Sequence, residues 1–440
     1  NGYRGRSSCD ARIQENGSWI PIVGMSYMSS GNAHSNNRNG GTTIGMGKSL
    51  SLTFVRGARR VTGSQFLLEA KEGEETTRIL IDCGLAQGER FCESVNKDAF
   101  PYDPGSVEAV FFTHAHADHI GLFPKLVKEG FAGRAYATRP TVDLMPVMLE
   151  DSVMIIGKEA ASCGYEAPYD VSDVEKAVHI IQETPYHTPV SVGPYAVTFL
   201  NAGHIVGSAM LLIEVFGKKL LFTGDMGRVP AAIVPDREVP PEVDYLIIES
   251  VYGNRLHGPL TSAEKTLIRE VNTVHEKKGV LLIPAFSLER TQIILSILDR
   301  AVGAGDIPNV PVFMDSPLAA KVTDIYRNHP EFLREDLKER SQRGDDPFSF
   351  PTLSLTIKRE ESDAIDRVPP PKIIIAGAGM SHGGRIRKHE RRYLPEKGTT
   401  LLLVGYQVPG SLGRRLKDGV KKVEIDGVWL SVRARVLSIE

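Results

Sequence analysis

The feature that most constrains this chain is a cluster of histidines and one aspartate directly after an apolar, strand-like segment. Residues 107–113 have the sequence VEAVFFT, and the next six residues are HAHADH. Alternate side chains of an extended segment point the same way, so His114 and His116 can meet one metal ion. Asp118 and His119 follow where the chain turns into a helix, and they can serve a neighbouring ion. Because imidazole and carboxylate ligands suit Zn²⁺, the sequence predicts a metal site here.

One loop cannot supply every ligand of two metal ions, so further ligands must come from elsewhere in the chain. Three polar residues share a suitable context, because each comes after an apolar run and has a glycine close behind it. They are Asp82 in ILIDCG, His204 in NAGHIVGSA and Asp225 in LFTGDMGR. Each of them alone is also explained as a turn residue or a core histidine. Together with HAHADH, they indicate one metal centre built from separate strand ends.

The pattern of apolar residues predicts an α/β chain with more than one domain. From Leu50 onwards, short alternating or β-branched runs are bounded by Gly, Asp or Pro, which is typical of strands and turns. After Ser250, helix and strand patterns alternate strictly, as expected for a parallel sheet. We expect Thr261 and Glu264 to form a capping box and Ser287 to cap the following helix.

The ends and the composition of the chain add several expectations. Residues 1–49 are rich in Gly, Ser and Asn without periodicity, so we interpret them as a disordered or extraneous segment. The 440 residues show no secretory leader and no apolar run that could span a membrane. The four cysteines include no CxxC, so neither a thiolate zinc cage nor a disulfide framework is indicated. A reducing, cytoplasmic location without a membrane partner fits these features.

Positive charge is concentrated in one stretch of the chain. The formal net charge of the whole chain is −2, whereas residues 377–422 hold eleven Lys or Arg against three acids, a local charge of +8. Such a segment favours a phosphate backbone as partner, although a solvated basic helix face explains it too. The candidate phosphate-binding residues are Ser316, Ser381, Gly383, Gly384, Arg385, Arg414 and Arg415.

Taken together, the motifs resemble those of the metallo-β-lactamase superfamily. HxHxDH followed by AGH and TGD is similar to the ligand signature of that superfamily. The blocks PAFSLERTQ, MDSPLA, AGMSHGGRI and VGYQVPGSLGRRL are similar to signatures of its β-CASP branch. That branch contains RNA-processing nucleases, which are cleavage-and-polyadenylation-specificity-factor-like and RNase J-like enzymes. The resemblance extends from about residue 50 to the end of the sequence.

The resemblance implies a fold and a division into domains. The fold is a four-layer αββα metallo-β-lactamase sandwich with an inserted α/β β-CASP domain. Residues 50–252 would form the first part of the sandwich, residues 253–371 the β-CASP domain, and residues 372–440 the return to the sandwich. The family pattern continues with Ser-x-His and V-H-G blocks that do not occur in this sequence. We therefore expect a chain truncated before these two histidine motifs, the alternative being a catalytically impaired protein.

The resemblance also implies how two Zn²⁺ ions are held. The first ion would be bound by three histidines, which are His114, His116 and His204. Asp118 and His119 would bind the second ion, and Asp225 would bridge both. Asp82 would orient a metal-bound water or a ligand. Glu249, the first acid of the β-CASP pattern, would orient a ligand histidine or the general acid.

The activity implied by the resemblance is hydrolysis of phosphodiester bonds in single-stranded RNA by a hydroxide activated between two zinc ions. Cleavage would be endonucleolytic, with exonucleolytic trimming as a second activity, and the protein would form a homodimer. The catalytic residues implied are Asp82, Asp118, Asp225 and Glu249. Two alternatives remain open, a DNA-directed β-CASP nuclease and a catalytically impaired RNA-binding scaffold. A simple β-lactamase is disfavoured, because it needs neither the insertion nor the basic segment.

Overall fold

The structure is a computed structural model of the chain. It describes residues 47–58, 60–87, 94–253, 258–408 and 410–439. It also gives the backbone of three short strands nearer the N-terminus, β1 (Arg12–Glu15), β2 (Ser18–Pro21) and β3 (Thr42–Thr43). The segment of residues 1–49 that we interpreted as disordered or extraneous lies mostly outside the described residues.

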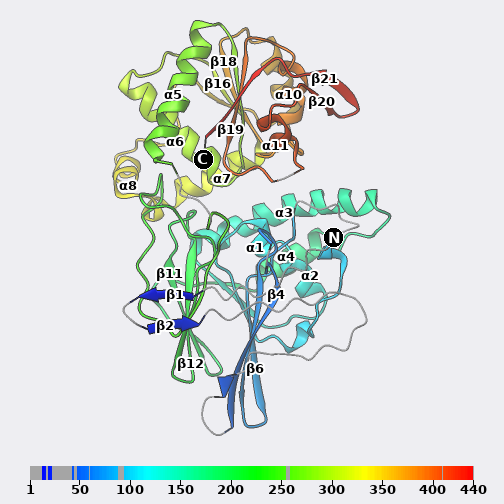
Figure 1. Cartoon of the computed structure of the whole chain (residues 1–440), viewed down its shortest axis with the longest axis vertical. Helices are drawn as coiled ribbons and strands as arrows, with labels where there is room; N and C mark the ends of the chain where they lie inside the picture. Colours follow the sequence, from blue (N-terminus) through cyan, green and yellow to red (C-terminus); the bar gives the residue numbers. More distant parts are fainter. Residues whose placement is uncertain are drawn as a thin grey trace, which may run out of the picture. The chain divides into compact units, whose positions relative to one another are not determined.

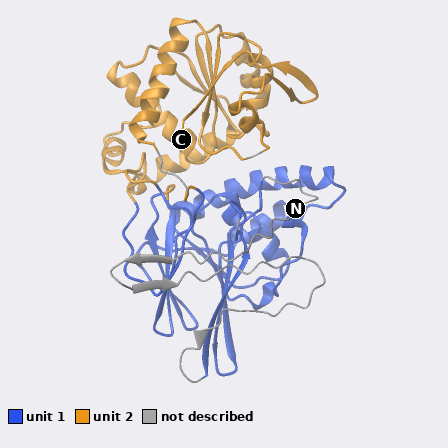
Figure 2. Cartoon of the chain, viewed as in Figure 1, with its two compact units in different colours: residues 1–203, 207–227, 237–251 blue, residues 204–206, 228–236, 252–440 orange. Residues whose placement is uncertain are grey.

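The chain divides into two compact units, which are coloured separately in Figure 2. The first unit takes in residues 1–203, 207–227 and 237–251. The second unit takes in residues 204–206, 228–236 and 252–440. Each unit has its own sheets and its own apolar core.

The first unit is built on two sheets. The seven-stranded sheet has the order β3-β4-β5-β6-β7-β8-β9. Its longer members are β4 (Lys48–Arg56), β5 (Gln65–Glu72), β6 (Glu75–Ile81), β7 (Ala109–Phe111), β8 (Arg134–Ala137) and β9 (Ile181–Glu183). The five-stranded sheet has the order β10-β11-β12-β13-β14. Its strands are β10 (Val190–Val192), β11 (Tyr195–Asn201), β12 (Ala209–Val215), β13 (Lys218–Phe222) and β14 (Tyr245–Ile247).

One apolar core joins these two sheets. Ile81 and Phe111 of the first sheet share a cluster with Phe199 and Phe222 of the second, and each is at most 1% exposed. Burying one such side chain stabilises the fold by about 1.5–3 kcal/mol. Because side chains alternate along a strand, the buried Val110 faces the other side of its sheet. The helices gather on that side (Figure 1), namely α1 (Ala117–Ile120), α2 (Phe123–Lys128), α3 (Arg139–Ser162) and α4 (Val171–His179).

The second unit is built on a six-stranded sheet whose neighbouring strands are all parallel. The order is β17-β16-β18-β15-β19-β22, with β15 (Val280–Pro284), β16 (Val312–Asp315), β17 (Leu353–Leu355), β18 (Lys372–Ala376), β19 (Thr399–Val404) and β22 (Arg435–Ile439). Its helices are α5 (Leu260–Glu276), α6 (Arg290–Ala304), α7 (Pro317–Asn328), α8 (Glu335–Gln342), α9 (Arg359–Ala364), α10 (Ile386–Tyr393) and α11 (Leu412–Lys417). A hairpin of β20 (Lys422–Ile425) and β21 (Val428–Ser431) projects from it (Figure 1).

The position of residues 372–440 corrects the division expected from the sequence. β18 lies between β15 and β16, and β19 lies between β15 and β22, all within the sheet of the second unit. The segments KIIIA and TTLLLV are continuous buried runs. Such runs are typical of strands covered on both faces of a parallel sheet. The expectation that residues 372–440 return to the first sandwich is therefore wrong for the described residues.

Two expected helix caps are also wrong. α5 begins before Thr261, which lies inside the first turn, and Glu264 instead pairs with Arg300 at 2.8 Å. α6 begins three residues after Ser287, whose hydroxyl lies 3.3 Å from that of Ser316. In both places a long-range partner takes the side chain that local sequence assigned to a cap.

Two expectations from composition can be compared with the structure. Cys163, directly after α3, is disulfide-bonded, which the cysteine spacing did not predict. Cys83 is a free, fully buried thiol. Among the helices that the structure describes, none combines the length and the apolar composition needed to cross a membrane.

Candidate metal centre

The metal-ligand candidates lie just beyond the ends of strands. Asp82 is the first residue after β6, and His114 comes three residues after β7. β6 and β7 are parallel neighbours, so their carboxyl ends meet at one edge of the sheet. Asp225 and His204 come three residues after β13 and β11, respectively. The candidates are therefore carried by short loops anchored on rigid strands.

Four of the candidates converge. One ligand atom each from His114, His116, His204 and Asp225 lies within 4.8 Å of all the others. The Nε2 atom of His114 is 3.0 Å from Nδ1 of His116 and 3.8 Å from Oδ2 of Asp225. Ligand atoms that share one tetrahedral zinc ion lie roughly 3.4 Å apart. The spacing of the four groups thus suits a single metal ion.

His119 approaches the other oxygen of Asp225. Its Nε2 atom is 3.3 Å from Oδ1 of Asp225, and its Nδ1 atom is 2.7 Å from Oδ2 of Asp82. We assign the proton to Nδ1, because a carboxylate can only accept a hydrogen bond there. In the neutral ring that a metal ion requires, Nε2 is then the atom that carries the lone pair. Asp82 therefore sets the tautomer and the ring orientation of His119.

Thr113 links these groups, and no sequence pattern singled it out. Its N–H donates to Oδ1 of Asp82 at 2.8 Å, and its hydroxyl lies 2.9 Å from Oδ2 of Asp82 and 3.0 Å from Nδ1 of His114. The only signal in the sequence is its place directly before HAHADH, where threonine is also an ordinary strand residue. Asp82 itself is fully buried with a φ of 56°, an unusual conformation for a residue other than glycine.

Two glycines allow these loops to approach one another. Gly224 has a φ of +51°, and a Cβ atom there would lie 2.7 Å from Cβ of Thr113. A Cβ atom on Gly84 would lie only 1.7 Å from the carbonyl oxygen of Asp118. That oxygen accepts a hydrogen bond from the N–H of Ser64 at 2.8 Å. Larger residues at either glycine would displace the loop that carries the histidines.

The electrostatics of the cluster favour a cation. Burial raises the pKa of the Asp118 carboxyl to about 6, with the positive charge of His119 opposing the rise and the negative charge of Asp225 adding to it. Burial lowers the pKa of His119, but Asp82 and Asp225 outweigh this effect and hold it well above its usual value. Carboxylates this close together repel one another, and a bound cation relieves that repulsion. The donor set of imidazoles and carboxylates therefore fits a divalent metal ion.

Glu249 lies two residues after β14. Its N–H donates to the hydroxyl of Thr223 at 3.3 Å, and its carboxylate accepts the N–H of Val251 at 3.0 Å. The side chain thus stabilises the turn that follows β14. Its role in orienting a histidine or the general acid stays a prediction.

Two of the candidate phosphate ligands have internal partners. Ser381 is fully buried, and its hydroxyl donates to Glu390 at 2.5 Å, so its contact with a phosphate group stays a prediction. The guanidinium of Arg385 donates to Asp315 at 2.7 Å and to two backbone carbonyl groups at 2.9 and 2.6 Å. These three internal hydrogen bonds fix the side chain of Arg385, and its contact with a phosphate group stays a prediction. The sequence showed the polarity of Ser381 and the charge of Arg385, but it did not show which residues the fold places beside these two side chains.

Three further candidates lie at turns and at a helix start. The hydroxyl of Ser316 caps α7 by accepting the N–H of Ala319 at 3.2 Å. Gly383 accepts the N–H of Ala378 at 3.2 Å through its carbonyl oxygen. Gly384 has a φ of +70°, which favours glycine. A phosphate contact at these three positions stays a prediction.

Comparison with known proteins identifies the family. The model of the metallo-beta-lactamase superfamily matches residues 58–272, and that of the Beta-Casp domain matches residues 291–416. The chain is 35% identical over 379 residues to Ribonuclease TTHA0252 of Thermus thermophilus, covering 86% of this chain and 84% of that protein. It is 30% identical over 393 residues to an RNase J-like protein of Methanocaldococcus jannaschii, covering 88% and 85%.

A longer relative is the Transcription termination factor FttA of Methanosarcina mazei. The chain is 34% identical to it over 388 residues, which cover 86% of this chain but only 59% of that protein. The expected α/β class and the motif-based resemblance are both confirmed. This chain belongs to the β-CASP branch of the metallo-β-lactamase superfamily.

Proposed function

We propose that this chain is a metal-dependent ribonuclease that hydrolyses phosphodiester bonds of single-stranded RNA. The observation that carries the proposal is the convergence of His114, His116, His204 and Asp225 to within 4.8 Å. Two relatives support the reaction and the substrate, because one is named a ribonuclease and another RNase J-like. Endonucleolytic cleavage, exonucleolytic trimming, a cytoplasmic location and a homodimer belong to the proposal as expectations from the family.

The proposed metal is Zn²⁺, with two ions per chain. His114, His116 and His204 would hold one ion, and Asp118 and His119 would hold the other. Asp225 would serve both, because its two oxygens lie 3.8 Å from Nε2 of His114 and 3.3 Å from Nε2 of His119. When bound, the ions would supply polarised water and stabilise the charge that develops on the phosphate.

Thr113 and Asp82, which contact the ligand histidines, would fix the tautomer and the orientation of their rings. The Thr113 hydroxyl donates to Asp82 at 2.9 Å, so its oxygen is free to accept Nδ1–H of His114 at 3.0 Å. Asp82 also accepts Nδ1–H of His119 at 2.7 Å. Both histidines then present the lone pair of Nε2 to the centre. Asp82 is thus proposed as a positioning residue, while Asp118 and Asp225 are proposed as ligands.

Removing the metal tests the function directly. We expect about two zinc ions per chain by elemental analysis, and a loss of cleavage of about 100-fold or more after chelation, restored by added Zn²⁺. The substrate is a labelled single-stranded RNA, with a DNA of the same sequence to test the DNA-directed alternative. A circular RNA, which has no ends, isolates endonucleolytic cleavage.

The controls separate a loss of chemistry from a loss of binding. RNA binding measured on filters should survive chelation, because the charged surface does not depend on the metal. Cleavage that continues undiminished in chelator would contradict the proposed function. A content of one zinc ion or none would contradict the binuclear assignment, and binding without any cleavage in the zinc-loaded protein would favour the scaffold alternative.

α11 carries the two arginines that we expect to contact RNA. Arg414 is half-buried and pairs with Asp418 at 2.9 Å. Arg415 is exposed, and its side chain forms no hydrogen bond or ion pair with another residue of the described ranges. The guanidinium of Arg415 is therefore the more available of the two for a phosphate group.

Replacing Arg415 by Gln should weaken RNA binding and lower its salt dependence. Removing one ionic interaction with a phosphate group reduces the slope of log affinity against log salt by about 1. The matched variant Arg414→Gln should have a smaller effect, because Asp418 already neutralises that side chain. Fluorescence anisotropy with a labelled RNA at several salt concentrations measures both slopes. If a variant with both substitutions had an unchanged salt slope, this face of α11 would be a solvated basic surface without a contact to RNA.

A further inference from the structure

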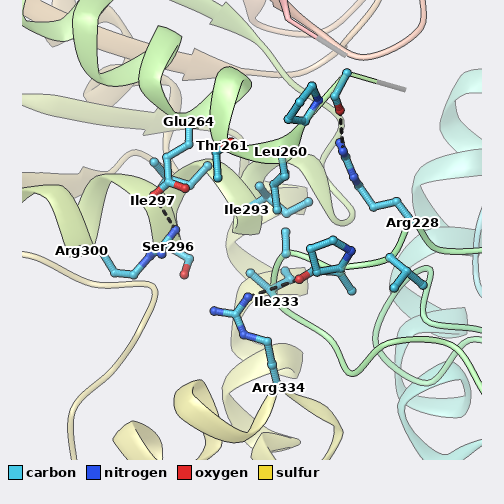
Figure 3. Close-up of a pocket in the computed structure, with 16 residues that line it drawn as sticks. Arg228, Ile233, Leu260, Thr261, Glu264, Ile293, Ser296, Ile297, Arg300 and Arg334 are labelled. Carbon is cyan, nitrogen blue, oxygen red and sulfur yellow. Dashed lines mark hydrogen bonds and ion pairs between the residues drawn. The ribbon is translucent and has the colours of Figure 1, made fainter. Parts of the chain in front are cut away.

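A cavity in the second unit has no part in the metal centre. Its volume is about 530 Å³, and it is lined by residues 228–233, the start of α5, one face of α6 and Arg334 (Figure 3). Cavities of roughly 300–1,000 Å³ are typical of sites for small organic ligands. All of its lining residues belong to the second unit.

Of the described residues that line this cavity, three are arginines, and two of these are neutralised. Arg300 pairs with Glu264 at 2.8 Å. Arg334 forms a two-pronged pair with Asp336 at 2.6 and 2.7 Å. Figure 3 shows the side chains of Arg300 and Glu264 joined at one wall of the cavity. The third arginine, Arg228, differs from these two.

Arg228 lines the cavity without a carboxylate partner among the described residues. Its Nη2 atom donates to the carbonyl oxygen of Gly258 at 2.7 Å, as the dashed line in Figure 3 marks. Its Nε atom is buried and has no hydrogen-bond partner. Burial lowers the pKa of this guanidinium, and the positive charge of Arg290 adds to the effect. A partly desolvated cation without a counter-charge is costly, and an anion beside it would offset the cost.

Aliphatic side chains line much of the rest of the cavity, beside the polar Thr261 and Ser296. Leu260 and Ile293 are partly exposed to it, while Ile233 and Ile297 are 2% and 8% exposed. Among the residues that the structure describes, those that line the cavity include no aromatic side chain. A nucleobase would therefore find no ring to stack on, whereas an aliphatic chain would bury apolar surface.

We propose that this cavity binds a small organic anion, with a carboxylate on Arg228 and an aliphatic body against Leu260, Ile293 and Ile297. A planar guanidinium holds a carboxylate by two parallel hydrogen bonds, which fixes the orientation of the head group. The aliphatic wall then selects for a chain over a bare ion. Neither inorganic phosphate nor an RNA backbone carries such a body.

Octanoate is a suitable probe because it combines both chemical features. Calorimetric titration should show that octanoate binds at least about tenfold more tightly than acetate, which lacks the chain, or octanol, which lacks the charge. In the same protein labelled at isoleucine methyl groups, the NMR signals of Ile233, Ile293 and Ile297 should shift on titration. Equal affinity for octanoate and acetate, or shifts confined to other isoleucines, would overturn the proposal.

Variants of the arginines complete the test. Arg228→Gln should weaken octanoate binding by about tenfold or more, and Arg228→Lys, which keeps the charge but loses the two-pronged geometry, should have a smaller effect. The matched control is Arg343→Gln, an arginine with a 75% exposed side chain that pairs with Glu339 and does not line the cavity. Thermal unfolding verifies that each variant is folded. If Arg228→Gln does not fold, unchanged binding in Arg228→Lys together with unmoved isoleucine signals overturns the proposal.

Discussion

Replacing Asp225 by Ala is expected to lower the rate of cleavage of a labelled single-stranded RNA by about 1,000-fold or more. The two carboxylate oxygens lie 3.8 Å from Nε2 of His114 and 3.3 Å from Nε2 of His119. The change therefore removes a ligand from both proposed ion positions at once. Single-turnover cleavage measures the chemical step, and elemental analysis should show a zinc content below that of the unmodified protein.

A surface aspartate of the same unit provides the control for Asp225. Asp143 pairs with Arg139 at 3.1 Å across one turn of α3, an exposed interaction that contributes only about 0.3–0.5 kcal/mol. Asp143→Ala should therefore cleave RNA at the unmodified rate. RNA binding should remain measurable in both variants. Turnover retained by the Asp225→Ala protein, with its zinc content intact, would rule out a shared ligand at this position.

The largest expected effect on stability comes from Asp315 at the end of β16. The carboxylate is completely buried and accepts four hydrogen bonds at 2.6–2.8 Å, from Thr356, Ser362, Arg385 and His389. Burial alone would raise its pKa, but these hydrogen bonds, led by that from His389, hold the pKa well below its usual range. Asp315→Ala would leave a guanidinium and a buried imidazole without their partner. The second unit should lose about 3–5 kcal/mol of stability.

Hydrogen exchange of the amides in β18 reports the stability of that unit, since β18 lies at the centre of its sheet. Asp345→Ala is the matched control, because this exposed aspartate also pairs with an arginine, Arg340, at 2.7 Å. An exposed pair of this kind contributes at most about 1 kcal/mol. If the Asp315 and Asp345 variants lost equal stability, the buried network would not be a principal support of the fold.

Much of the candidate metal centre could be predicted from local sequence patterns. His114 and His116 alternate after an apolar run, and an extended backbone alone is enough to aim them the same way. Asp82, His204 and Asp225 could be proposed because each follows an apolar strand and lies near a glycine. Three such residues in one chain that also contains HAHADH are more readily explained as metal ligands than as separate turn or core residues. These predictions depend on neighbours within a few residues, where sequence and geometry are closely coupled.

Long-range partners decided the rest. The sequence suggested Arg385 and Ser381 as phosphate ligands, but it did not show that the fold places Asp315 and Glu390 beside them. Thr113 carries no pattern of its own, yet it contacts Asp82 because the parallel strands β6 and β7 end at the same edge of the sheet. Residues 372–440 were assigned to the wrong sheet, since an apolar run specifies burial but not which strands will pair with it.

The sequence by itself determined the family and the α/β class, and it pointed out the candidate metal ligands, because ligand type and strand pattern are properties of short segments. Only the tertiary structure decided which charges remain available. It placed a carboxylate beside Arg300 and Arg334 and none among the described residues beside Arg228. Such pairing depends on contacts between residues far apart in the chain, and the order of the amino acids does not specify these contacts directly.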